Sequence, residues 1–189
     1  RYFRAPELQD CGICRRNGAD VMDAKRHQHT IQGYRNKYNG QLFENIITAS
    51  CHYYYQQKKA LIIKTPEPMK PIKDLGGGKF VAYYEKHAQP DYKGTFSTGQ
   101  TVIFDAKHTE EDHLKQSAVT PAQTESLNKH YDFGARCFIV VSFGFQQFFN
   151  VPWEVFREMK ERYGRKYIKP EDIPEYRVQF DGSIVKFLG

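Results

Sequence analysis

Two acidic residues and a lysine in this chain could form a metal-dependent hydrolytic site. Asp91 stands at a turn, and Asp105-Ala106-Lys107 closes an apolar run that begins at Thr101. Residues two apart on a strand face the same side, so Asp105 and Lys107 should project together with the Ala106 carbonyl nearby. Carboxylate and carbonyl oxygens suit Mg²⁺ or Mn²⁺. Such an ion polarises a phosphate and acidifies its bound water, while the lysine orients that water or stabilises developing charge.

A simpler interpretation is a surface Asp–Lys ion pair at a strand end, which is a common arrangement. Two further residues favour the functional interpretation. Glu44 interrupts the apolar run Leu42–Ile47, and Gln123 stands in the first turn of a helix that Thr120 could cap. Either could also be an ordinary solvated side chain. Taken together, they extend the candidate site beyond the Asp–Lys triplet.

The elements that must position these residues alternate between helical and strand patterns. Helices are predicted at 31–58, 120–132 and 155–163, and strands at 60–64, 80–84, 101–106, 137–143 and 183–188. This order predicts a mixed α/β domain with a central sheet and flanking helices. We expect an N-terminal extension at 1–30, a single domain at 31–189, and a protruding proline- and glycine-rich segment at about 66–79.

The net charge of +6 and the pI near 9.0 favour a polyanionic partner such as nucleic acid, although a mildly basic enzyme would look similar. Arg165 and Lys166 lie in a basic aromatic cluster that could contact a DNA backbone or simply be solvated. No apolar run is long enough to span a membrane, so no membrane partner is predicted.

The four cysteines suggest a reduced protein, and we expect a cytoplasmic, nucleoid-associated location. Cys51 and Cys137 stand in apolar contexts and should be core residues. Cys11 and Cys14 form a C-x-x-C pair, but the histidines that follow have an unusual spacing for zinc. We therefore expect free thiols there rather than a zinc site.

The full pattern resembles a known family. The spacing Asp-x(13)-Asp-x-Lys after a Glu-bearing helix is similar to that of PD-(D/E)xK nucleases. More narrowly, the chain from about 40 to 188 resembles the RecU-type Holliday junction resolvases in consistent order, through the segments 40–47, 61–68, 91–94, 102–109 and 137–143, and through Gln123.

The resemblance implies a restriction-endonuclease-like fold and a homodimer that nicks two strands of a four-way DNA junction, in DNA recombination and repair. It implies metal-associated acids at Glu44, Asp91 and Asp105, a catalytic lysine at Lys107, and a supporting role for Gln123. The 66–79 segment would be a stalk that enters the junction centre. The lysines expected to contact phosphate are Lys64, Lys70, Lys73 and Lys79.

Two departures from the family pattern bear on these expectations. The family more often has Glu where Asp105 stands, and the stalk is short and rich in glycine. Two alternatives therefore stay open: a less selective nuclease of the same fold that cuts flaps or single strands, and a catalytically silent DNA-binding recombination protein. The intact set of acids with Lys107 argues against the silent protein.

Overall fold

The computed structural model describes residues 18–66, 69–84 and 89–189, so Cys11 and Cys14 lie outside the described residues. The chain divides into two compact units, Arg1–Lys37 and Tyr38–Gly189. The second unit contains the central sheet and all of the candidate catalytic residues. In the described part of the chain, no helix is long and apolar enough to cross a lipid bilayer.

The first helix, α1 (Gly18–Gln56), begins well before the predicted residue 31. Its first turns are rich in polar and charged residues without apolar periodicity, so the sequence pattern gave no helical signal there. Within the second unit, α1 buries Phe43, Ile47, Cys51 and Tyr54, which recur every three or four residues and so share one helical face. This face packs into a core cluster together with strand residues of the sheet.

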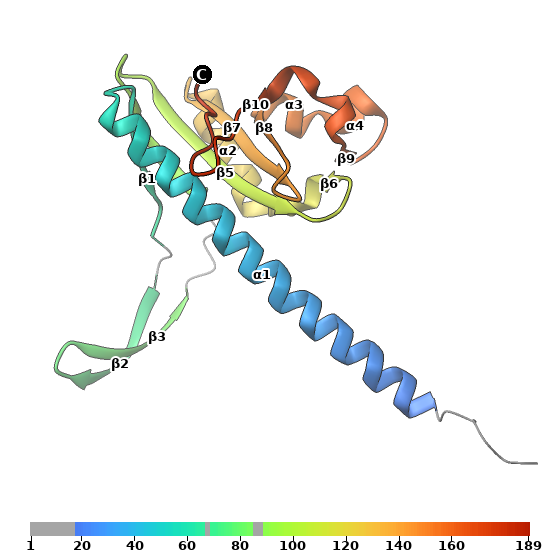
Figure 1. Ribbon diagram of the computed structural model, residues 1–189. Helices are drawn as coiled ribbons and strands as arrows, with labels where there is room; N and C mark the ends of the chain where they lie inside the picture. Colours follow the sequence, from blue (N-terminus) through green and yellow to red (C-terminus); the bar gives the residue numbers. More distant parts are fainter. Residues whose placement is uncertain (1–17, 67–68, 85–88) are drawn as a thin grey trace, which may run out of the picture. The chain divides into compact units, whose positions relative to one another are not determined.

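The central sheet has six strands in the order β1-β4-β5-β7-β8-β10. Figure 1 labels β1, β5, β7, β8 and β10 of this sheet. They are β1 (Ala60–Lys64), β4 (Tyr92–Phe96), β5 (Thr101–Thr109), β7 (Arg136–Phe143), β8 (Gln147–Pro152) and β10 (Arg177–Val178). Only β5 and β7 pair in parallel within this sheet. A parallel pair needs a crossover connection, and α2 (Pro121–Asp132) lies in that connection. The predicted mixed α/β architecture is confirmed.

Two hydrophobic clusters occupy the two faces of the sheet. One cluster joins α1 to Val102, Phe104 and Ala106 of β5. The other joins Ile103 of the same strand to α2 and to α3 (Trp153–Arg157). This alternation follows from the period of two in a strand, and it makes β5 a central strand buried on both faces.

The predicted protruding segment forms a hairpin rather than an irregular excursion. Strands β2 (Met69–Gly76) and β3 (Lys79–Tyr84) pair as a separate two-stranded sheet, inserted in the sequence between β1 and β4. Pro71 and the glycines disfavour a strand in a central sheet. A two-stranded ribbon can contain proline, because both of its strands are edge strands and its pairing can be irregular. The register shifts between Pro71 and Lys73. Gly76, Gly77 and Gly78 all have positive φ and make the turn.

The C-terminal elements differ in detail from the prediction. The helix predicted at 155–163 is two short helices, α3 and α4 (Met159–Tyr163), and Gly164 in the left-handed region ends the second. The predicted 183–188 strand is reduced to an isolated bridge between Phe180 and Val185. The sequence pattern missed β8. The remaining elements are β6 (Leu114–Lys115), β9 (Tyr167–Ile168), η1 (Gln116–Ala118), η2 (Pro170–Asp172) and η3 (Pro174–Tyr176).

Candidate active site

The structure brings Asp91, Asp105 and Lys107 together. The Lys107 ammonium lies 3.5 Å from Asp91 Oδ2 and 3.3 Å from Asp105 Oδ2. Asp91 immediately precedes β4, and the other two residues lie on one face of β5, as their spacing predicted. Neither Asp105 nor Lys107 is at the end of its strand, because parallel pairing with β7 extends β5 to Thr109. That part of the prediction was wrong.

Backbone hydrogen bonds fix the two carboxylates against each other. The Asp91 N–H donates to Asp105 Oδ1 at 2.7 Å, and the Ala106 N–H donates to Asp91 Oδ2 at 3.1 Å. The antiparallel register places Tyr92 opposite Phe104, so that the residues beside them, Asp91 and Asp105, are neighbours across the hairpin. The Tyr92 and Phe104 rings stack with centroids 4.8 Å apart, which packs the other face of this pair.

Burial and charge set the protonation of the site. The Asp105 side chain is fully buried, and this burial raises its pKa to about 6, although the Lys107 charge opposes the shift. For Lys107, burial alone would lower the pKa. The negative charges of Asp105 and Asp91 outweigh burial and raise the pKa of Lys107 above its usual value. Lys107 is therefore an ammonium ion at neutral pH.

The donor atoms at this point fit a hard divalent cation. Asp105 Oδ2 is buried and accepts no hydrogen bond of good geometry, although the Lys107 ammonium lies at ion-pair distance. Its neighbours are the Asp91 carboxylate and the backbone of Ala106, which offer further oxygen donors of the kind Mg²⁺ and Mn²⁺ prefer. Among the described residues, however, no three acidic, histidine or cysteine side chains gather closely enough to bind a metal. The third predicted acid is placed elsewhere.

Glu44 forms an ion pair with Lys64 rather than joining the other two acids. Its Oε2 lies 2.6 Å from Lys64 Nζ, and both side chains are partly exposed. The backbone of Glu44 is nevertheless tied to the site, because the Tyr92 hydroxyl donates to the Glu44 carbonyl at 2.9 Å. Glu44 as a metal ligand stays a prediction.

Gln123 is buried in a local structural role. Thr120 caps α2 as predicted: its hydroxyl accepts from the Gln123 N–H, while Gln123 Oε1 accepts from the Thr120 N–H at 3.1 Å. This is a capping box. In the described part of the chain, the side-chain hydrogen bonds of Gln123 go to Thr120, so the supporting catalytic role also stays a prediction.

His108 is a buried strand residue beside the site. It follows Lys107 on β5, and its side chain is 3% exposed. Its ring nitrogens contact Ser142 Oγ at 3.2 Å and Glu110 Oε1 at 3.0 Å, and its ring stacks on Phe145. The signal that could have found it is the period of two, which places position 108 on the opposite face of β5 from Lys107.

The predicted DNA-contacting cations have different surroundings. Arg165 makes a two-pronged ion pair with Asp172, at 2.7 and 2.5 Å, and lies over the Tyr167 ring. This ion pair is compatible with a structural role for Arg165 and also with a contact to DNA. Lys166 is exposed, and Lys70, Lys73 and Lys79 are exposed along the β2–β3 hairpin. The same hairpin exposes large apolar side chains that the sequence analysis did not single out: Met69, Ile72, Leu75, Phe80, Val81 and Tyr83.

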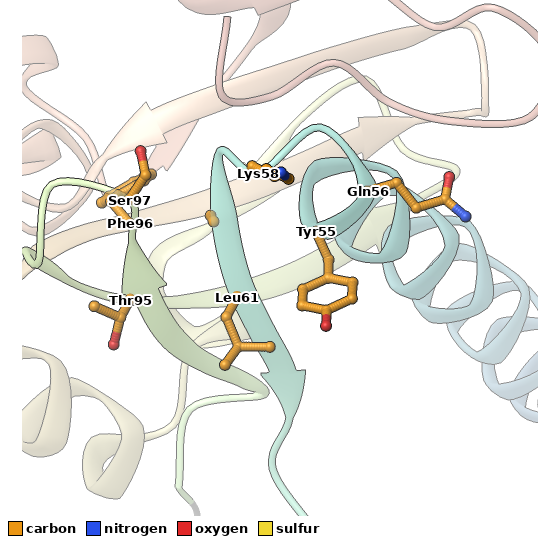
Figure 2. Close-up of a pocket in the computed structure, with 8 residues that line it drawn as sticks. Tyr55, Gln56, Lys58, Leu61, Thr95, Phe96 and Ser97 are labelled. Carbon is orange, nitrogen blue, oxygen red and sulfur yellow. The ribbon is translucent and has the colours of Figure 1, made fainter.

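A surface hollow lies away from these acids, between the end of α1, strand β1 and the end of β4 (Figure 2). Tyr55, Leu61 and Phe96 line it with smaller and polar side chains, and no acidic residue contributes to it. Because it lacks groups for phosphate chemistry, we assign the candidate active site to the carboxylates and not to this hollow.

Known proteins resemble this chain to different degrees. Curated relatives named "Holliday junction resolvase RecU" from Streptococcus pneumoniae are 26% identical over 133 residues, covering 67% of each chain, or 25% identical over 164 residues, covering 82% of each chain. A solved structure described as Hjc, a Holliday junction resolvase from Archaeoglobus fulgidus, is 15% identical, with a TM-score of 0.46, covering 72% of this chain and 93% of that one. The family model described as "RecU: Recombination protein U" matches residues 38–188. This chain therefore belongs to the RecU family.

Proposed function

We propose that this protein is a divalent-metal-dependent endodeoxyribonuclease that resolves four-way DNA junctions by paired nicks, in DNA recombination and repair. The observation that carries the proposal is the Asp91–Asp105–Lys107 constellation in a member of the RecU family. The curated relatives named as Holliday junction resolvases supply the substrate class.

The buried Asp105 Oδ2, which has no hydrogen bond, supports a metal ion at this point. We expect Mg²⁺, with Mn²⁺ as a substitute, held by Asp91, Asp105 and the carbonyl of Ala106. When bound, the ion would polarise the scissile phosphate and lower the pKa of a water molecule.

Lys107 then acts through its charge. Because both neighbouring carboxylates raise its pKa, it holds its proton at neutral pH and is not available as a general base in this state. A fixed ammonium at this position stabilises the negative charge that develops on the phosphate during cleavage. The charge supports the role expected for the lysine in stabilising developing charge, and it argues against a role as general base.

The β2–β3 hairpin supports recognition of branched DNA. It combines exposed lysines with exposed apolar and aromatic side chains, among them Phe80 and Tyr83. Lysines attract the phosphate backbone, and aromatic rings stack on unpaired bases, which are available where strands exchange. A homodimer would provide two active sites for the two nicks.

The test compares cleavage of an end-labelled four-way junction with cleavage of linear duplexes of the same sequence, in Mg²⁺, Mn²⁺ or EDTA. The wild type should give paired nicks near the crossover that need metal, and Asp105→Asn should give none. Asp132→Asn, an exposed carboxylate at the end of α2, is the matched control and should cut normally.

Each other outcome selects an alternative. Equal cutting of junction and duplex would leave a nuclease without junction selectivity. Tight binding without cutting in either metal would indicate a silent DNA-binding protein. Sedimentation at several concentrations tests the dimer independently, and a monomer at the concentrations that give paired nicks would contradict that part of the proposal.

A further inference from the structure

The Lys64–Glu44 ion pair lies beside the site without being part of it. We propose that Lys64 holds the Glu44 carboxylate away from Asp91 and Asp105 until a DNA phosphate binds Lys64, so that DNA binding completes the metal site. The inference rests on the proposed function, and it assigns to Lys64 a positioning role in addition to contact with DNA.

The backbone of Glu44 is already in place for this change. Tyr92 is fully buried, and its hydroxyl donates to the Glu44 carbonyl at 2.9 Å and lies 3.0 Å from Thr48 Oγ1. Tyr92 also directly follows Asp91. The turn of α1 that carries Glu44 is therefore fixed to β4 at the residue that directly follows the first acid. The Glu44 side chain itself has three rotatable bonds, which can redirect its carboxylate.

Lys64 is fixed to the same strand. It is the register partner of Tyr92 across β1 and β4, and the N–H of the next residue, Thr65, donates to the Asp91 carbonyl at 2.8 Å. The Lys64 side chain is 43% exposed, so a DNA phosphate can reach its ammonium. A phosphate oxygen can replace the Glu44 carboxylate there, since both accept charge-assisted hydrogen bonds.

The charges explain why Glu44 stays with Lys64 in the absence of metal. Asp91, Asp105 and Lys107 together carry one net negative charge, so a third carboxylate would be repelled. A divalent cation reverses this repulsion. Metal and DNA would therefore each favour the released form of Glu44, and binding of either should strengthen binding of the other, because such coupling is reciprocal.

The expected size of the effect is modest. Both members of the pair are partly exposed, and exposed ion pairs of this kind shift an equilibrium by about two- to fivefold. Removal of the Lys64 charge should therefore tighten metal binding by about this factor, and only when Glu44 is present.

The experiment measures Mn²⁺ binding to the full chain without DNA, by the electron paramagnetic resonance signal of free Mn²⁺. Lys64→Met should bind Mn²⁺ about two- to fivefold more tightly than the wild type. Glu44→Gln should be close to the wild type, and the double variant should lose the gain. Lys93→Met removes the same charge from an exposed position on β4, opposite Ile63, without touching Glu44, and it should show less than a twofold change.

A second arm of the experiment adds linear duplex DNA, which a junction-selective enzyme should bind without cutting. A sample of the duplex alone corrects for the Mn²⁺ that the DNA itself binds. The duplex should tighten Mn²⁺ binding to the wild type by the same factor, but not to Lys64→Met or Glu44→Gln. If Lys64→Met matches the wild type, or if the gain persists in the double variant, the positioning role is wrong. If Asp105→Asn removes no Mn²⁺ binding from the wild type, the metal site of the proposed function fails instead.

Discussion

Replacement of Asp105 by Asn should remove a specific pH dependence from the stability of the fold. Burial raises the pKa of Asp105 from 3.8 to about 6. The folded state therefore binds this proton more tightly than the unfolded state does. The stability that the group contributes is present below about pH 4 and is lost as the pH rises through about 6. At pH 8 the buried carboxylate is ionised, and it destabilises the fold relative to acidic conditions.

The size of this effect on the free energy of unfolding follows from the shift in the pKa of Asp105. One pKa unit corresponds to about 1.4 kcal/mol, so a shift of this size corresponds to roughly 2–3 kcal/mol between pH 4 and pH 8. The Asp105 side chain is completely buried, so solvent screening does not reduce the value. The quantity to compare is the change in unfolding free energy from pH 4 to pH 8, because effects of the amide that do not depend on pH cancel in it.

The assay is urea unfolding in EDTA, followed by the fluorescence of the single tryptophan, Trp153, which is buried in the core. Between pH 4 and pH 8 the wild type should lose roughly 2–3 kcal/mol more stability than Asp105→Asn. Asp132→Asn, on the exposed end of α2, should behave like the wild type. An identical pH dependence in Asp105→Asn and the wild type would refute the reasoning that burial controls this carboxylate.

Three further predictions concern the framework around the site. A Cβ added at Gly94 would lie 2.1 Å from the carbonyl oxygen of Leu61, so Gly94→Ala should destabilise the fold by about 1–3 kcal/mol in urea unfolding. Gly40→Ala meets no atom within 4 Å in the middle of α1, and it should instead stabilise the protein by about 0.5–1 kcal/mol in the same assay; a loss of stability there would contradict the helix assignment. Tyr92→Phe removes the hydroxyl that bonds the Glu44 carbonyl and should cost about 1 kcal/mol, with unchanged far-ultraviolet circular dichroism.

The sequence predicted those parts of the fold whose residues follow a clear period or a strong local signal. The apolar run at 101–106, the continuous apolar run at 137–143 and the Thr120–Pro121 helix start all correspond to observed elements. The strand predicted at 80–84 is observed as β3, but the start of α1 and the first strand of the hairpin, β2, were missed for a common reason. In both places the local composition, polar residues in one and proline and glycine in the other, conceals the backbone conformation.

The sequence pattern predicted only part of the arrangement of the candidate site. Spacing alone placed Asp105 and Lys107 on one face, and the contacts among Asp91, Asp105 and Lys107 agree with it. The partners of Glu44 and Gln123 depend on which side chain lies nearest in three dimensions, and no period encodes that choice. For Glu44 this partner is Lys64, twenty residues along the chain and on a different element.

The aspartate at position 105 is held by its contact with the backbone. One carboxylate oxygen accepts the Asp91 N–H at 2.7 Å, and this leaves the other, buried and without a hydrogen bond, as the oxygen available to a cation. A side chain longer by one methylene group would have to give up this hydrogen bond or push into a fully buried site. The short carboxylate therefore links the geometry of the metal-binding atoms directly to the pairing of β4 with β5. The Asp91 carboxylate in turn accepts a hydrogen bond from the Ala106 N–H, so a shift of Asp91 would also displace Asp105.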